Sequence, residues 1–120
     1  LFRSDVCKKF DELLASHGYV RNGKYYNVEK GNKETIVFFC HLGIECVLLS
    51  HLFSLPSIIL AQHFSPLPTS VSYLISEERK EGIAQFRALE LFDISHLKLK
   101  KISPSFMGRF RENSFDNERS

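Results

Sequence analysis

Residues 35–43, Thr-Ile-Val-Phe-Phe-Cys-His-Leu-Gly, constrain the fold more than any other part of this chain. The first six are apolar, β-branched or aromatic, which is typical of a strand buried on both faces. Such strands lie at the centre of α/β sheets, so Ile36 to Phe39 are predicted to form a central parallel strand. His41 then lies at the carboxyl end of that strand, where open α/β sheets bind ligands and the next helix offers its free amides.

The flanking residues predict alternating helices and strands. An apolar stripe predicts a first helix that ends near His17, with Gly18 as its left-handed terminal residue. A second helix is expected from Gly43 to Phe53, because apolar residues recur there at helical spacing. The other expected elements are a hairpin at 19–26 with a type I′ turn at Asn-Gly, a short helix at 57–63, and antiparallel strands at 71–76 and 83–91 around a charged turn.

Length and charge narrow the class of protein. A chain of 120 residues with 43% apolar residues can form one small domain with its own core. Its 16 basic and 14 acidic residues are spread evenly and leave a net charge of +2, so no basic block indicates nucleic-acid binding. No apolar stretch reaches the roughly 20 residues of a membrane span. We expect a soluble protein that binds neither nucleic acid nor membrane.

The cysteines indicate a reducing compartment. Cys7, Cys40 and Cys46 are odd in number and lack Cys-x-x-Cys spacing, and two of them lie in segments expected to be buried. Free thiols and a cytoplasmic location are therefore predicted. A metal site that combines Cys40 and Cys46 with His41 and His51 is not expected, because neighbouring strand residues point to opposite faces. No other cofactor is expected either.

The two ends of the chain differ from its middle. The sequence starts at Leu1 without a methionine and enters a helix almost at once, as expected of a segment from inside a longer protein. Residues 103–120 alternate single Phe residues with polar ones and show no period. They are expected to form an irregular tail, pinned in part by Phe106, Phe110 or Phe115, after a folded region at 1–102.

An apolar strand, a His-x-Gly element and an amphipathic helix with Leu-Leu-Ser-His-Leu that ends at Leu-Pro follow one another between Thr35 and Leu55. Further along, Pro-Thr-Ser-Val opens a strand at residue 68 and Glu-Glu-Arg stands at 77–79. Together these motifs resemble the second-histidine half of the histidine phosphatase superfamily, the phosphoglycerate mutase-like proteins. The resemblance implies that residues 1–102 are the C-terminal part of such a domain, a partial three-layer α/β fold with a mixed sheet and flanking helices.

In that family, the histidine of an Arg-His-Gly motif accepts the phosphoryl group, while arginines and a second histidine hold the phosphate oxygens. His41 matches the second histidine and is the catalytic residue that the resemblance implies, although by spacing alone such a histidine is more often structural. Gly43 would let the backbone approach the phosphate, and Thr69 and Ser70 are candidates for added hydroxyl contacts. The implied ligand is a phosphorylated small molecule.

The sequence contains no Arg-His-Gly, so two functional hypotheses stay open. One is a phosphomonoester hydrolase or phosphoglycerate mutase-like protein that needs a missing N-terminal half and is inactive alone. The other is a non-catalytic binding or interaction module whose exposed strand edge pairs with another chain. If the missing-half hypothesis is right, the isolated chain should self-associate through Val37, Phe39 and the apolar side of the helix at 44–52.

Overall fold

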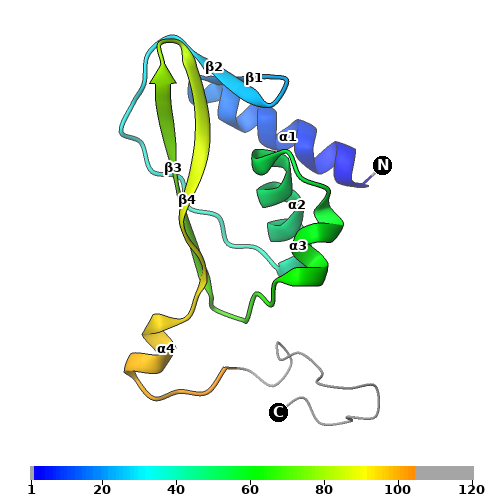
Figure 1. The fold of residues 1–120 in the computed structure, drawn as a ribbon, viewed down its shortest axis with the longest axis vertical. Coiled ribbons are helices and arrows are strands. Elements are labelled where there is room, and N and C mark those ends of the chain that lie inside the picture. The colour runs from blue at the N-terminus through cyan, green and yellow to red at the C-terminus, as the bar shows by residue number, and fades with distance from the viewer. Residues whose placement is uncertain (1, 105–120) are drawn as a thin grey trace.

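The computed structural model describes residues 2–104, in which helices and strands alternate along the chain (Figure 1). The predicted tail, with Phe106, Phe110 and Phe115, lies outside the described residues apart from positions 103 and 104. The elements are α1 (Phe2–Ser16), β1 (Tyr19–Asn22), β2 (Tyr25–Val28), α2 (Leu42–Phe53), α3 (Ser57–His63), β3 (Val71–Lys80), β4 (Ile83–Asp93) and α4 (Ser95–Leu99). None of these helices is both long and apolar enough to cross a membrane.

The four strands form one sheet in the order β1-β2-β4-β3, and every neighbouring pair is antiparallel. The short β1-β2 hairpin pairs with the long β3-β4 hairpin through Tyr26, opposite Ala84, and Asn27, opposite Ile83, and the Val28 amide donates to the Gly82 carbonyl at 2.9 Å. In Figure 1, α1, α2 and α3 gather on one side of the two hairpins, and α4 lies at the far end of the long one. The described residues thus form a mixed α/β domain whose sheet is antiparallel throughout rather than mixed.

The first helix and hairpin follow local signals in the sequence. Helix α1 buries Phe10 and Leu14, and Gly18 follows it with φ of +95°, as predicted. The predicted hairpin is also present, but its two loop residues are Gly23 and Lys24. Of these, only Gly23 has a positive φ, +65°, so the turn is of the type II′ kind rather than the predicted type I′.

Two apolar clusters make up the core. The first lies between α1 and the sheet around Tyr26 and Ala84, which are both 1% exposed, and Phe86 packs its ring edge-on against Tyr26. The second lies between α2, α3 and the long hairpin and is centred on Cys46, Leu49 and Leu60. Helix α2 and strand β4 contribute side chains to both clusters.

The long hairpin begins where the sequence predicts it and extends further. Strand β3 runs to Lys80, so the charged residues 77–80 lie in the strand rather than in a turn. The loop is only Glu81 and Gly82, and Gly82 takes a φ of +82° that favours glycine. One of these charged residues pairs across the hairpin, because Glu77 binds Arg87 at 2.9 Å.

The prediction of a central parallel strand at Ile36–Phe39 is wrong. Residues 29–41 form neither helix nor strand, although α2 begins directly after them. Val37 is 66% exposed and Phe39 is 95% exposed, whereas Phe38 packs its ring 5.6 Å from that of Phe10 on α1. The residue types favour a strand, but a strand also needs a neighbouring backbone, and the described residues provide none at this place.

Candidate functional site

His41 lies directly before α2 and acts as the N-cap residue of that helix. Its backbone is extended, with φ of −93° and ψ of 167°, and its exposed imidazole makes no capping hydrogen bond. Its carbonyl oxygen accepts the first helical bond from the Glu45 amide at 3.0 Å. The amides of residues 42–44 therefore have no acceptor inside the helix, and they point out of its positive end. The imidazole and these amides together can donate hydrogen bonds to an anion.

Gly43 lies in the first turn of α2, as the sequence predicts. A Cβ atom added to Gly43 would meet nothing within 4 Å, and its φ is not positive. Within residues 2–104, neither the packing nor the backbone requires glycine at this position. The expectation that Gly43 makes room for a phosphate concerns a bound ligand and stays a prediction.

A hydrogen-bond chain ties the first turn of α2 to the long hairpin. The Ser72 hydroxyl donates to Glu45 Oε1 at 3.0 Å, and its oxygen accepts the Phe92 amide at 3.1 Å. The Glu45 carboxylate is thus fixed one turn from His41. This link between α2, β3 and β4 has no counterpart in the sequence analysis, because its three residues are far apart in the chain and match no motif.

Thr69 and Ser70, the predicted hydroxyl contacts, lie in the turn before β3. Thr69 has a φ of +66°, and its Oγ1 is 3.2 Å from Nε2 of His96 on α4. The Ser70 amide donates to the Leu67 carbonyl at 3.0 Å. Among residues 2–104, no hydrogen bond joins either residue to His41 or Gly43. The structure therefore pairs Thr69 with His96, while His41 and Gly43 remain together at the start of α2.

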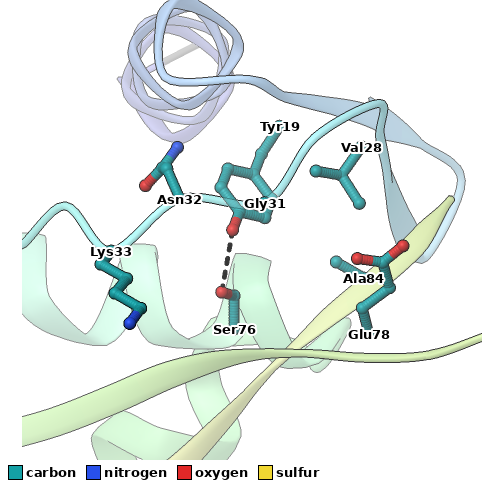
Figure 2. Close-up of a pocket in the computed structure, with 8 residues that line it drawn as sticks. All are labelled: Tyr19, Val28, Gly31, Asn32, Lys33, Ser76, Glu78 and Ala84. Atoms are coloured by element: carbon teal, nitrogen blue, oxygen red, sulfur yellow. Dashed lines mark hydrogen bonds between the residues drawn. The ribbon is translucent and has the colours of Figure 1, made fainter. Parts of the chain in front are cut away.

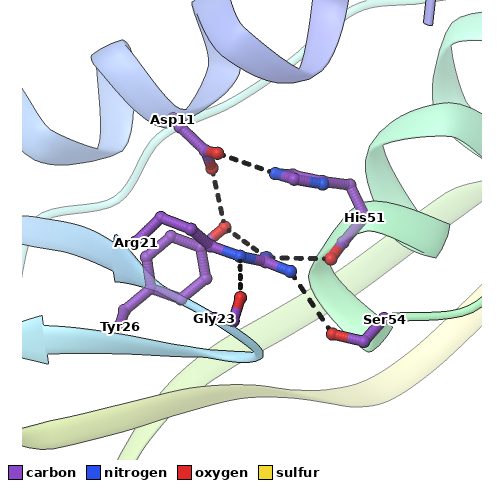
Figure 3. A network of polar contacts seen from close by, with 6 residues as sticks. All are labelled: Asp11, Arg21, Gly23, Tyr26, His51 and Ser54. Atoms are coloured by element: carbon purple, nitrogen blue, oxygen red, sulfur yellow. Dashed lines mark hydrogen bonds and ion pairs between the residues drawn. The ribbon is translucent and has the colours of Figure 1, made fainter. Parts of the chain in front are cut away.

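A polar network connects α1, the short hairpin and the end of α2 (Figure 3). Nε2 of His51 lies 2.8 Å from Asp11 Oδ2, and the Tyr26 hydroxyl donates to the other oxygen of Asp11 at 2.9 Å. Burial raises the pKa of Tyr26 to about 12, and the hydrogen bond to Asp11 acts in the same direction. Tyr26 is thus a neutral donor at ordinary pH.

Arg21 completes this network. Its Nη1 donates to the Tyr26 hydroxyl at 3.0 Å and to the His51 carbonyl at 2.9 Å, so its positive charge lies at the negative end of α2. Nε and Nη2 donate to the Gly23 carbonyl at 2.6 Å and the Ser54 hydroxyl at 3.3 Å. Each residue of the network bonds to another member, and within residues 2–104 no serine or cysteine is bonded to the His51 ring. The network fastens three elements together and contains no activated nucleophile.

No motif in the sequence indicates this network. The His51 side chain is only 17% exposed and faces Asp11. Forty positions separate the two residues in the chain, and no spacing rule connects them.

A cavity of about 300 Å³ lies between the loop after β2 and the long hairpin (Figure 2). Its lining residues are Tyr19, Val28, Gly31, Asn32, Lys33, Ser76, Glu78 and Ala84. Most of its polar groups are already paired: the Tyr19 and Ser76 hydroxyls lie 3.0 Å apart, Asn32 binds the His17 carbonyl and the Glu34 amide, and Glu78 accepts the Gly82 amide. Lys33 is the one charged side chain of the lining that has no bonded partner in the described chain.

The three cysteines are free thiols in different surroundings. Cys46 is buried in the second core cluster, whereas Cys40 is exposed, so the prediction that its segment is buried is wrong. Burial raises the pKa of the Cys46 thiol, and the negative charge of Glu45 acts in the same direction. The pKa of the Cys40 thiol is also raised, by partial desolvation from neighbouring atoms and by the charge of Glu45. Within the described residues no group of three or more potential metal ligands comes together.

Comparison of the chain with models of known protein families, with curated proteins and with solved structures gave no match.

Proposed function

We propose that this chain is the phosphate-holding part of a phosphomonoester hydrolase of the histidine phosphatase type. In this proposal, residues 1–102 belong to a three-layer phosphoglycerate mutase-like domain with a mixed sheet. Another segment, on the same or a separate polypeptide, supplies a strand and the nucleophilic Arg-His-Gly histidine. His41 and the first turn of α2 bind the phosphate oxygens of a phosphorylated small molecule.

The observation that carries the proposal concerns residues 35–40, the unpaired segment. It has the composition of a buried strand, yet none of its peptide groups takes part in a hydrogen bond within residues 2–104. Exposed apolar side chains gathered in one place favour burial against another surface, and free backbone groups on an extended segment can pair with another strand. A strand from another segment would satisfy both, and His41 would then lie at the end of a paired strand.

The chemistry at the start of α2 agrees with phosphate binding. The imidazole of His41 is exposed and has no hydrogen-bond partner in the described chain, and the three amides that follow it are free of helical bonds. In phosphoryl transfer, such donors stabilise the oxygens as charge redistributes in the transition state. The exposed Cys40 thiol precedes His41, but its raised pKa keeps it protonated and a poor nucleophile, so the proposal assigns attack on phosphorus to the histidine of the added segment.

Phosphate binding can be tested on the chain as it is. Titration of isotope-labelled protein with inorganic phosphate or vanadate should shift the amide resonances of Leu42, Gly43 and Ile44, and His41→Ala should remove these shifts. His63→Ala is the matched control, because His63 is an exposed histidine at the C-terminal end of α3, where no free helical amides are available. Shifts confined to other residues, or equal effects of the two variants, would contradict the proposal.

Activity provides the second test. The chain alone should hydrolyse a generic aryl phosphate no faster than buffer, because it lacks Arg-His-Gly. Fusion to an upstream half that carries Arg-His-Gly should bring hydrolysis that requires His41. Robust hydrolysis by the chain alone that is lost in His41→Ala would show that the missing-nucleophile argument is wrong.

The exposure of the unpaired segment also favours a second candidate, a non-catalytic interaction module. In this case a strand of a partner protein pairs with residues 35–40 and no phosphate is bound. The two candidates differ in the phosphate titration. Pairing with a partner strand without any response of residues 42–44 to phosphate would select the interaction module.

A further inference from the structure

The unpaired segment alternates in exposure along its length, as a strand does. Val37 and Phe39 are 66% and 95% exposed, whereas Ile36 and Phe38, which alternate with them, are 37% and 46% exposed. The less exposed side faces α1, where Phe38 packs against Phe10. The segment thus alternates in exposure as a strand does and contacts α1 through Phe38, and within residues 2–104 its backbone groups are unpaired.

This segment also lacks the features that protect natural strand edges. No Asp, Glu, Lys, Arg or Pro occurs between Glu34 and Glu45. The free edge of β3, in contrast, ends in the charged run Glu-Glu-Arg-Lys at 77–80. Charged side chains and prolines are the usual means by which edges avoid pairing with other chains. The unpaired segment therefore has no charged side chain or proline that would hinder pairing with a strand of a second chain.

Two antiparallel copies of the segment can pair with each other in a register centred on one residue. If two copies run antiparallel with a two-fold axis at Val37, Ile36 of each copy lies opposite Phe38 of the other, and Thr35 lies opposite Phe39. β-Branched residues opposite aromatic ones are among the favourable cross-strand pairs. No pair in this register places like charges together.

We propose that a second copy of this chain occupies one edge of this segment, and that two chains form a symmetric dimer by antiparallel pairing of residues 35–39 about Val37. A strand has two edges, so pairing with a second copy on one edge leaves the other edge for the added segment of the proposed function. The dimer goes beyond phosphate binding and does not depend on it. Each chain supplies the same strand to the other, so the interface closes on itself and gives dimers rather than fibres.

The test is the association state of the full chain by sedimentation equilibrium. The wild type should dimerise with a dissociation constant in the range of about 1–100 µM, typical of a small interface. Val37→Lys opposes two positive charges at the axis and should raise the dissociation constant at least about tenfold. Val37→Glu should act in the same way. Since Val37 is two-thirds exposed, neither variant should change the circular dichroism spectrum.

Mixing the two variants makes the test specific for the register. Val37→Lys and Val37→Glu place opposite charges at the axis, so an equimolar mixture should restore a one-to-one heterodimer. Val71→Lys is the matched control, because Val71 is 51% exposed on the edge strand β3, and this variant should dimerise like the wild type. A wild type that stays monomeric at about 100 µM, a Val37→Lys variant that still dimerises, or a mixture that does not recover would each overturn the proposal.

Discussion

Replacement of Arg21 by methionine should destabilise the fold strongly. Methionine keeps much of the side-chain volume but removes all four hydrogen bonds that Arg21 donates. The two bonds from Nη1, to Tyr26 and to the His51 carbonyl, are partly buried, and the other two are exposed. At about 1.5 kcal/mol for each partly buried bond from a charged group and little for the exposed ones, we expect a loss of about 3 kcal/mol.

Urea unfolding followed by circular dichroism measures this loss. Because small domains have a free energy of unfolding of about 5–15 kcal/mol, the midpoint should move clearly to lower urea. Arg79→Met is the matched control, since the Arg79 side chain is 72% exposed and pairs only with Glu77 at the surface. Its effect should stay below about 1 kcal/mol. If the two variants lose equal stability, the network does not fasten α2 in the way described.

Three further predictions use the same stability assay or simple labelling. The pKa of Tyr26 is raised from 10.0 to about 12 in the folded protein, so the unfolded chain loses this proton first as the pH rises. The free energy of unfolding should therefore be unaffected by Tyr26 below pH 10 and fall by about 2–3 kcal/mol between pH 10 and 12. Tyr26→Phe should lack that part of the fall. Gly43→Ala should raise the free energy of unfolding by about 0.5–1 kcal/mol, because a Cβ meets nothing there and alanine favours a helix; a loss of stability would show that the space is not open. Under native conditions, a thiol reagent should label Cys40 well before Cys46, which is buried; mass spectrometry of the labelled protein would refute this if the order were reversed.

The elements that the sequence predicted well depend on neighbouring residues. Gly18 ends α1, the apolar spacing after Gly43 gives α2, and Pro56 precedes the short helix α3. Each of these signals acts within one or two turns of the chain, where propensity and capping decide the outcome. The hairpin turn lies one residue further along than predicted. The observed turn needs a positive φ only at its first loop residue, and Gly23 takes that place, so Asn22 stays in the strand.

The parts that could not be predicted depend on what lies opposite a residue. The unpaired segment has every local property of a strand, but strand formation requires a second backbone, which no local pattern reveals. In the candidate site, the position of His41 and Gly43 at the start of α2 could be read from the sequence. The partner of Thr69 could not, because His96 is 27 residues away, and the same is true of the bond between Asp11 and His51.

Helix α2 and strand β4 supply side chains to both core clusters, with Leu48 and Leu52 in one and Cys46 and Leu49 in the other. Loss of either cluster therefore exposes a face of the same helix and removes support from the other cluster. The two halves of this elongated domain should for that reason unfold in one transition, with the same midpoint by every probe. Hydrogen exchange would show this as a shared rate for the slowest amides of α1 and of β3, although no side chain of α1 reaches the second cluster.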